Sequence, residues 1–300
     1  MNISTFKNIV CPKTKQPLEL EVMRKEKEII MEGTLYNKQQ GIIYNIHNGI
    51  PDFTYPLTLK VSDKEFNQKY QENADAYDEG MSWLFSSFYE TEEVIRTKLV
   101  NHLNIKRNDF ILNMGCGSGS DSEYIVRQLG SKGKLFNFDL SGNLLRIAEK
   151  KLNARKSQVE YFIGNGSYLP FKENTFDSLF HFGGINIFSE KKKAINEMIR
   201  VVKPGGKVVF GDESAAPWLR NKEFGNFIIN ANPLYKHTPP LHLLPENARD
   251  VSLHYLLGDS FYVIVFSKGV PAKLNLDLAI PGKRGGSLRS RYESMLNSKK

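Results

Sequence analysis

The chain has few cysteines and no long apolar segment. Two cysteines among 300 residues, Cys11 and Cys116, exclude a disulfide framework. No apolar run reaches the roughly 18 residues that a membrane-spanning helix needs, and the N-terminus lacks the charged-then-apolar layout of a secretory signal. These absences predict a cytoplasmic protein with no membrane partner.

Positive charge is concentrated in the last thirty residues. The formal net charge is +8, and residues 271–300 contribute +5 of it, from seven basic and two acidic side chains. The basic residues are Lys273, Lys283, Arg284, Arg289, Arg291, Lys299 and Lys300. The rest of the chain therefore gives little indication of a broad nucleic-acid-binding face. We expect 271–300 to be a basic, flexible tail; alternatively, it folds back to hold an anionic acceptor or RNA.

A glycine-rich loop follows the apolar strand predicted at 110–114. Its glycines, Gly115, Gly117 and Gly119, let the backbone turn tightly and approach a ligand. The helix predicted after the loop offers free N–H groups to a negatively charged group. Asp139 ends the next predicted strand, where an acidic residue accepts hydrogen bonds from a ribose diol. The pattern predicts a site for an adenosine-type cofactor, although its G-x-G-x-G spacing departs from the dinucleotide fingerprint.

Apolar segments alternate with helical patterns from residue 110 onward. The predicted strands are 110–114, 134–139, 159–163, 178–182 and 207–211. This alternation predicts a parallel sheet with helices on both faces. Segments 251–257 and 261–267 flank a turn and predict an antiparallel hairpin. The expected fold is therefore α/β, with a Rossmann-like, mostly parallel sheet of seven strands and a C-terminal hairpin.

The glycine loop is the first of four segments that resemble the class I S-adenosylmethionine (SAM) methyltransferases. The other three are 138–141, then 164–166 with 169–171 and 176–177, then 200–206 running into 207–210. The resemblance covers roughly residues 70–267, and the chain is most similar to the ubiquinone/menaquinone-biosynthesis subgroup. It implies that SAM is the cofactor.

The resemblance also implies which residues contact the cofactor. They are Asn113, Gly115, Cys116, Gly117, Gly119, Asp139, Leu140, Asn165, Gly166, His181, Phe182 and Tyr77. Asn113 replaces an acidic residue and loses the charge that would favour the cofactor's ammonium group. Asn165 stands where the family often has Asp, and its carbonyl offers the same acceptor to the adenine amine. Asn165 as a turn residue and His181 as a structural histidine remain alternative interpretations.

Candidates for a catalytic base lie at or after the carboxyl ends of the predicted strands. They are His181, Glu213, and two histidines, His237 and His242, of a Pro- and aromatic-rich insert at about 217–245. The insert is expected to form a wall of the acceptor pocket. Each histidine is alternatively a surface or packing residue, Glu213 is alternatively a solvated helix cap, and no metal-binding set is predicted.

Residues 1–55 form a short, β-rich segment that resembles the zinc-ribbon-like module of the tRNA-methyltransferase activator family. Cys11/Thr14 and Asn37/Gln40 stand where two C-x-x-C pairs would be. Structural zinc requires four N or S ligands, which one thiolate does not supply. We therefore expect a metal-free module held by apolar residues.

The remaining boundaries divide the chain into a helical linker or lid at 56–109 and a SAM-binding domain at 110–270. The predicted function is in-line transfer of the SAM methyl group to a small-molecule acceptor. Two alternatives remain: an RNA methyltransferase that uses the basic tail and the N-terminal module, or a non-catalytic binding partner that keeps the fold. Neither the acceptor atom nor the oligomeric state follows from the sequence.

Overall fold

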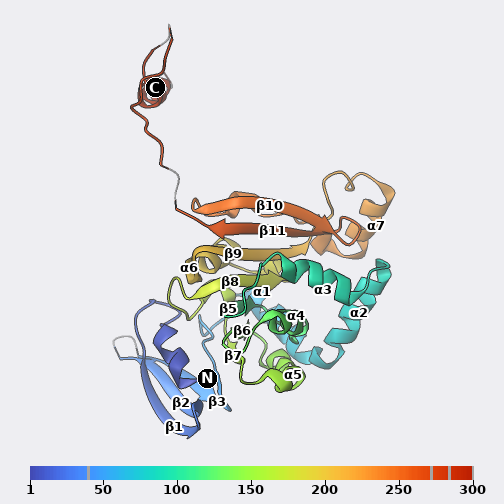
Figure 1. Ribbon diagram of the computed structural model, residues 1–300. Helices are drawn as coiled ribbons and strands as arrows, with labels where there is room; N and C mark the ends of the chain where they lie inside the picture. The colour runs from blue at the N-terminus through green and yellow to red at the C-terminus, as the bar shows by residue number, and fades with distance from the viewer. Residues whose placement is uncertain (39–40, 271–272, 283–284, 299–300) are drawn as a thin grey trace. The chain divides into compact units, whose positions relative to one another are not determined.

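The computed structural model describes residues 1–38, 41–270, 273–282 and 285–298. Gln40 and four basic residues of the tail, Lys283, Arg284, Lys299 and Lys300, lie outside the described residues. The chain divides into two units, residues 1–269 and 270–300. Figure 1 shows their elements.

The N-terminal segment forms a small antiparallel sheet with the strand order β1-β2-β3-β4. Its strands are β1 (Glu19–Glu26), β2 (Ile29–Asn37), β3 (Ile42–His47) and β4 (Ile50–Pro51). Alternate residues of a strand point to opposite faces, and on β3 Tyr44 and Ile46 are buried while their neighbours Asn45 and His47 are exposed. One face of this sheet is therefore apolar and covered.

The main sheet has seven strands in the order β10-β11-β9-β8-β5-β6-β7. They are β5 (Phe110–Met114), β6 (Lys134–Asp139), β7 (Val159–Ile163), β8 (Phe176–Phe182), β9 (Val202–Glu213), β10 (Ala248–Leu256) and β11 (Phe261–Lys268). The strands from β5 to β9 pair in parallel, and the β10–β11 hairpin joins β9 antiparallel. The predicted fold class is confirmed.

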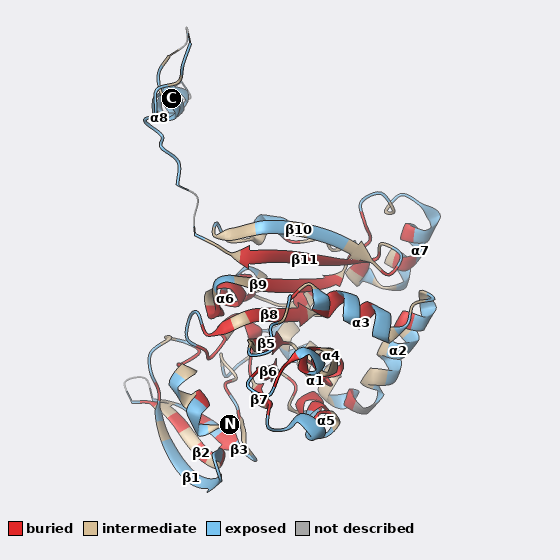
Figure 2. Ribbon diagram, viewed as in Figure 1, coloured by how far each residue is buried: buried red, intermediate tan, exposed pale blue. Residues whose placement is uncertain are grey.

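Helices cover both faces of the main sheet, and the alternation of strand residues supplies a core to each face. On one face, Leu112 and Phe210 join a cluster that contains residues of α6 (Lys191–Val201) and of the N-terminal module. On the other face, Ile111 and Val209 join residues of α3 (Glu92–Asn101), α4 (Ser120–Gln128) and α5 (Gly142–Lys151). Figure 2 shows the central strands as the most buried part of this unit.

The N-terminal module packs directly against the main domain. The Phe53 N–H donates to the Ile163 carbonyl at 2.7 Å, which links the end of the module to β7. Glu160 of β7 accepts hydrogen bonds from the Asn2 N–H at 2.7 Å and from Thr5 Oγ1 at 2.6 Å. Apolar residues of both parts belong to one core cluster. The module and the sheet therefore share a hydrophobic core.

The module contains no recognisable metal centre among the residues that the structure describes. Cys11 is buried, and its Sγ lies 3.5 Å from Tyr44 Oη. Buried apolar residues, including Ile30 and Leu35, fill the space between the two parts.

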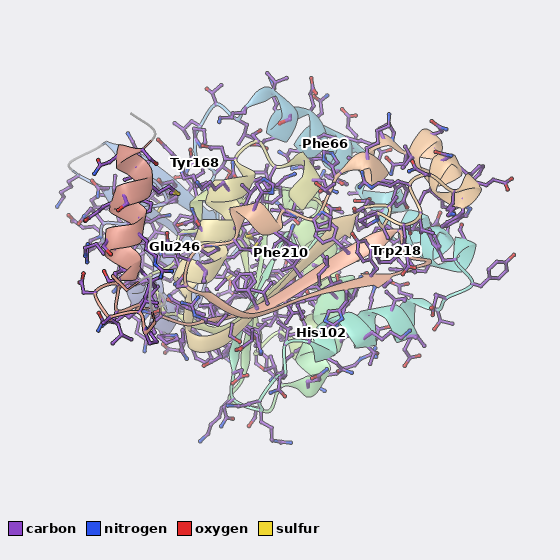
Figure 3. All side chains as sticks on the ribbon, turned by 90° about the horizontal axis from the view of Figure 1, so that it is seen from above. Phe66, His102, Tyr168, Phe210, Trp218 and Glu246 are labelled. Atoms are coloured by element: carbon purple, nitrogen blue, oxygen red, sulfur yellow. The ribbon has the colours of Figure 1, made fainter. Side chains whose placement is uncertain are left out.

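Additional elements surround the hairpin. The insert contains α7 (Glu223–Ala231) and two short 3-10 turns, η6 (Pro233–Lys236) and η7 (Leu241–Leu243). Trp218 packs on Tyr255 of β10 with ring centroids 5.1 Å apart, and His102 lies 4.8 Å from His254 of the same strand (Figure 3).

The second unit contains one helix, α8 (Leu288–Asn297), among its described residues. Ser287 and Ser290 form a reciprocal capping box at its start. In the described parts of both units, no helix is long and apolar enough to cross a membrane.

Candidate functional site

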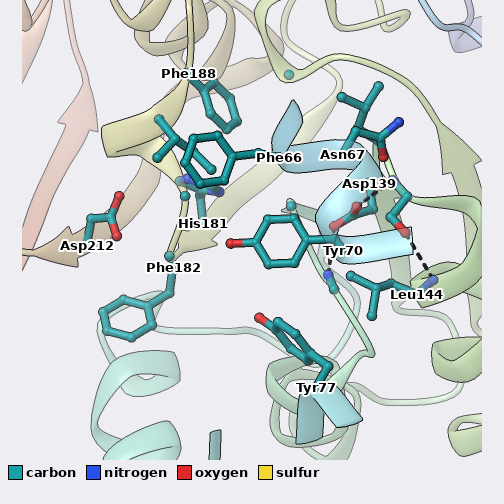
Figure 4. Close-up of a pocket in the computed structure, with 18 of the residues that line it drawn as sticks. Phe66, Asn67, Tyr70, Tyr77, Asp139, Leu144, His181, Phe182, Phe188 and Asp212 are labelled. Carbon is teal, nitrogen blue, oxygen red and sulfur yellow. Dashed lines mark hydrogen bonds between the residues drawn. The ribbon is translucent and has the colours of Figure 1, made fainter. Parts of the chain in front are cut away.

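A cavity of about 410 Å³ lies at the carboxyl ends of β5, β6, β8 and β9. Its cover comes from α1 (Val61–Glu72) and α2 (Tyr77–Ser87), which precede the sheet in the chain (Figure 4). Open α/β sheets bind ligands at this edge, because the loops after parallel strands meet there.

The glycine loop after β5 forms one wall of the cavity. Gly115 and Gly117 have φ angles of 66° and 54°, in the left-handed region that favours glycine. A Cβ atom on Gly115 would lie 3.0 Å from the His181 ring. The loop therefore places backbone atoms directly against the cavity. Side chains at these two positions would strain its conformation.

Asp139 ends β6 and fixes the conformation of this loop. Its Oδ2 accepts from the Gly117 N–H at 2.8 Å, and its Oδ1 accepts from the Ser141 N–H at 2.8 Å. Burial raises the pKa of this carboxyl, and the backbone donors oppose that rise. Each carboxylate oxygen has a further lone pair, and Asp139 lines the cavity (Figure 4). The carboxylate is placed to accept hydrogen bonds from ligand hydroxyls.

Asn165 and Gly166 line the cavity beyond Asp139. The Asn165 Oδ1 accepts from the Ser167 N–H at 2.9 Å, and its buried Nδ2 has no partner among the described residues. Because an amide oxygen has two lone pairs, Asn165 keeps one acceptor position in addition to this unpaired donor.

Aromatic residues of α1 and α2 cover the cavity. The rings of Tyr70 and Tyr77 meet edge to face, with centroids 6.0 Å apart. Burial raises the pKa of Tyr70 to about 12, and the charges of Glu213, Asp212 and Asp139 add to this rise. Tyr70 therefore lies between the Asp139 end of the cavity and an acidic end at β9 (Figure 4).

Polar contacts at its two ends hold α1 over the cavity. At its start, Ser62 Oγ lies 2.6 Å from Ser189 Oγ, and Asp63 Oδ1 accepts from the Ser189 N–H at 3.0 Å. At its end, Gln71 Oε1 accepts from the Asn143 N–H at 3.1 Å. No residue of α1 is fully buried. The helix is therefore held over the cavity by polar contacts at both of its ends and by half-buried side chains such as Tyr70.

His181 at the end of β8 lines the cavity and has one ring nitrogen without a partner among the described residues. Its Nδ1 lies 2.7 Å from the Met114 carbonyl oxygen. Because a carbonyl only accepts, Nδ1 carries the proton and Nε2 keeps its lone pair. Nε2 is buried and has no partner in the part of the chain that the structure describes, and burial lowers the pKa of the ring. His181 is thus a neutral hydrogen-bond acceptor.

Two adjacent carboxyl groups, Asp212 and Glu213, form the acidic end of the cavity at the end of β9. Asp212 is fully buried, and it accepts from the Asn186 N–H at 2.5 Å and from the Glu213 N–H at 3.0 Å. Burial raises the pKa of Glu213, and the hydrogen bond and negative charge of Asp212 raise it further. Glu213 is the candidate base from the sequence, and Asp212, the residue before it in β9, lines the same cavity.

The chain matches models of two known protein families. A model described as the ubiE/COQ5 methyltransferase family matches residues 58–224, which is more than half of the chain. The chain belongs to the ubiE/COQ5 methyltransferase family. A second model, described as Trm112p-like protein, matches residues 5–49 of the N-terminal module.

Two curated relatives illustrate the extent of the similarity. A demethylmenaquinone methyltransferase of Oceanobacillus iheyensis is 36% identical over 115 residues, covering 38% of this chain and 48% of that protein. A demethylmenaquinone methyltransferase of a Geobacillus species is 31% identical over 162 residues, covering 52% of this chain and 69% of that protein. The aligned part of the chain thus spans about half to two thirds of the length of these relatives.

A solved structure shares the fold. The phosphoethanolamine N-methyltransferase 2 of Haemonchus contortus, solved in complex with SAM, superposes with a TM-score of 0.54. The sequences are 14% identical, and the match covers 76% of this chain and 64% of that one. At this identity the likeness describes the fold alone.

The structure brings most of the predicted cofactor-contacting residues of this ubiE/COQ5 family member to the cavity. These are Gly115, Gly117, Asp139, Leu140, Asn165, Gly166, His181, Phe182 and Tyr77. Asn113, Cys116 and Gly119 do not line it. Asn113 Nδ2 instead donates to Ser122 Oγ at 2.9 Å, and this hydroxyl donates to Asn137 Oδ1 at 2.8 Å. The Asn113 side chain therefore joins β5, α4 and β6 inside the core.

Gly119 has a structural task at the start of α4. Its φ is 82°, and a Cβ on it would lie 2.8 Å from the Cβ of Ala148 in α5. We expect Gly119→Ala to lower the free energy of unfolding by about 1–3 kcal/mol, because it combines backbone strain with overpacking. Urea unfolding measures the change. Gly80→Ala is the matched control, since its Cβ would meet nothing within 4 Å; equal losses in both variants would contradict the packing argument.

The insert reaches the cavity through Leu234, and the residues described as lining the cavity include neither His237 nor His242. The His237 backbone carbonyl accepts from Ser214 Oγ at 2.7 Å and from Arg220 Nη2 at 2.6 Å, and His242 is exposed. The structure therefore does not place these two histidines as bases, whereas His181 and Glu213 do line the cavity.

Proposed function

We propose that the protein transfers the methyl group of SAM to a small-molecule acceptor. The observation that carries this proposal is the junction of the Gly115–Gly117 turn with the Asp139 carboxylate at the floor of an aromatic-covered cavity. Membership of the ubiE/COQ5 methyltransferase family supports the same conclusion. SAM supplies a methyl group that its sulfonium centre already activates, so much of the rate acceleration can come from positioning.

The residues of the cavity fit this cofactor in three respects. Asp139 offers carboxylate oxygens to the ribose hydroxyls. The loop glycines leave space beside the backbone, where a Cβ on Gly117 would lie 3.4 Å from the Tyr77 ring. Tyr70 and Tyr77 cover the cavity and exclude water from the reacting atoms. Residues of this chain perform all three roles, and none of the roles requires a nucleophilic side chain.

The cover over the cavity favours a small acceptor over a polymer. Phe66 and Tyr70 of α1 line the cavity from above (Figure 4), and α1 is fixed at both ends to the main domain. A nucleotide within an RNA chain would have to displace this helix to reach the floor. A small molecule can be enclosed beneath it.

Incubation with methyl-labelled SAM and an extract of the source cells tests the proposal. We expect label in a small-molecule product, and we expect SAM to raise the melting temperature because it binds the folded state. Separation by size and nuclease treatment distinguishes the acceptor classes. Nuclease-sensitive label in large material would move the acceptor to RNA, and a thermal shift without labelled product would favour a non-catalytic binding role.

A further inference from the structure

A polar cluster around Asp78 ties the start of α2 to the glycine loop. Asp78 Oδ1 accepts hydrogen bonds from Ser118 Oγ and from Ser120 Oγ, the latter at 3.3 Å. Asp78 Oδ2 accepts from Lys151 Nζ at 2.8 Å. Both serines are buried. One carboxylate therefore joins three segments that are distant in the chain: α2, the glycine loop with the start of α4, and the end of α5.

The cluster is better shielded from water than an ordinary surface ion pair, which water and salt weaken. The Lys151 side chain is 21% exposed and the Asp78 side chain is 41% exposed. Lys151 Nζ also donates to Ser120 Oγ at 2.9 Å. Burial raises the pKa of the Asp78 carboxyl, but hydrogen bonds from Lys151 and Ser118 outweigh this effect and lower it. Asp78 is therefore ionised at neutral pH, and its hydrogen bonds are charge-assisted.

This attachment determines where Tyr77 lies, because Tyr77 directly precedes Asp78. Tyr77 and Gly117 both line the cavity (Figure 4). A Cβ on Gly117 would lie 3.4 Å from the Tyr77 ring and 3.5 Å from its hydroxyl oxygen. The Gly117 N–H in turn donates to Asp139 Oδ2 at 2.8 Å. The cluster therefore holds the Tyr77 ring against the same turn that Asp139 fixes from the other side.

The far end of α2 is anchored in a different way. Phe85 is 1% exposed and belongs to the core on the α3, α4 and α5 face of the sheet. The Arg96 guanidinium lies 5.2 Å from the centre of the Phe85 ring, and its Nη1 donates to Asp121 Oδ1 at 2.7 Å. Apolar packing thus fixes the end of α2, and polar contacts hold its start. Polar contacts at a surface can be exchanged for water, so the start of the helix is the part that can open.

We propose that Asp78 and Lys151 are positioning residues for SAM: their ion pair holds Tyr77 over Gly117, and it must open before the cofactor enters or leaves. This inference rests on the methyltransferase function proposed above, because SAM is the ligand that Tyr77 encloses. Neither Asp78 nor Lys151 is among the described residues that line the cavity. Both therefore act on the cofactor through Tyr77 and not by contact with it.

The release of bound SAM tests this role. The protein is loaded with radiolabelled SAM, an excess of unlabelled SAM is added, and the retained label is followed by rapid filtration. We expect SAM to leave Asp78→Asn and Lys151→Met at least about fivefold faster than the wild type. Asn keeps an oxygen for the serine hydroxyls, and Met keeps most of the apolar stem of Lys. Because both residues act through one contact, the double variant should release SAM no faster than the faster single variant.

Lys203→Met is the matched control. Lys203 Nζ lies 2.7 Å from Asp177 Oδ1, and neither residue is among the described ones that line the cavity. Its release of SAM should equal that of the wild type, and equal acceleration in this variant would contradict a specific role of Asp78. Unchanged release in Asp78→Asn and Lys151→Met would overturn the proposal while the methyltransferase function stood. A wild-type protein that retains no SAM would overturn both.

Amide hydrogen exchange in the absence of SAM gives a second readout. In an α-helix each N–H bonds the carbonyl four residues earlier, so the N–H groups of residues 81–84 report on the first turn of α2. We expect these amides to exchange at least about fivefold faster in Asp78→Asn than in the wild type or in Lys203→Met. Unchanged exchange at residues 81–84 would show that the ion pair does not hold the helix and would refute the proposal.

Discussion

Asp139→Ala should remove most of the stabilisation that SAM gives to the protein. At a SAM concentration 100 times its Kd, the wild-type protein gains about 2.7 kcal/mol, which corresponds to a rise of roughly 5–10 °C in melting temperature. Each hydrogen bond to a charged group is worth about 1.5–3 kcal/mol. Because Asp139 also orients the Gly117 and Ser141 N–H groups, we expect at least a hundredfold weaker binding and a shift of about 1 °C or less.

Two companion variants separate loss of the ligand contact from loss of loop structure. Asp139→Asn keeps one carbonyl oxygen for the backbone donors but removes the charge, so its SAM-induced shift should fall between those of the wild type and Asp139→Ala. Glu149→Gln removes an exposed charge from α5 and should behave as the wild type. Differential scanning fluorimetry over a SAM titration gives all three values. An undiminished shift in Asp139→Ala would show that the cofactor binds elsewhere.

Phe53→Ala should destabilise the whole first unit rather than the N-terminal module alone. The Phe53 side chain is fully buried, and it belongs to the core cluster that also contains Phe138, Phe162 and Phe171 of the main domain. Removing a buried Phe side chain costs about 3–5 kcal/mol, a large part of the 5–15 kcal/mol that is typical of folded proteins. We expect a single unfolding transition at a much lower urea concentration than that of the wild type. Circular dichroism during a urea titration measures this transition.

Phe227→Ala is the matched control, because Phe227 lies on α7 and is 70% exposed. Its free energy of unfolding should change by no more than about 0.5 kcal/mol. Two separate transitions in Phe53→Ala, of which the second coincides with the wild-type transition and keeps its SAM response, would show that the module folds independently. A single displaced transition would show that the shared core couples the two parts.

The bounds of a strand in the main sheet can be predicted from the local sequence where an apolar run is flanked by residues that favour turns. The bounds predicted for β5, β6 and β7 agree with the structure. β9 differs because it begins at Val202 rather than at residue 207. Val202 pairs with Phe176, and the pairing resumes with Lys207 opposite Ser178 after a register shift. The intervening Pro204 and Gly205, which locally indicate a turn, form an irregularity in which Gly205 has a φ of 80°.

Site residues at the ends of strands could be predicted from the sequence. Residues whose place in the site depends on the direction of the side chain could not. Asp139 and His181 occupy strand ends, so their place at the ligand edge follows from topology. The direction of Asn113 depends on Ser122 and Asn137, which no spacing rule identifies. Tyr70 does not follow a strand, and its neighbours in the cavity come from distant parts of the chain, so no local pattern places it in the site.

The hydrogen bond from the Phe53 N–H to the Ile163 carbonyl joins two parts of a single polypeptide, and this has a consequence for supply in the cell. A partner tethered on the same chain is present at a fixed one-to-one ratio and at an effective concentration that dilution does not lower. Changes in protein abundance therefore cannot leave the methyltransferase domain without its module. The face of the module that is buried here is equally withheld from other proteins.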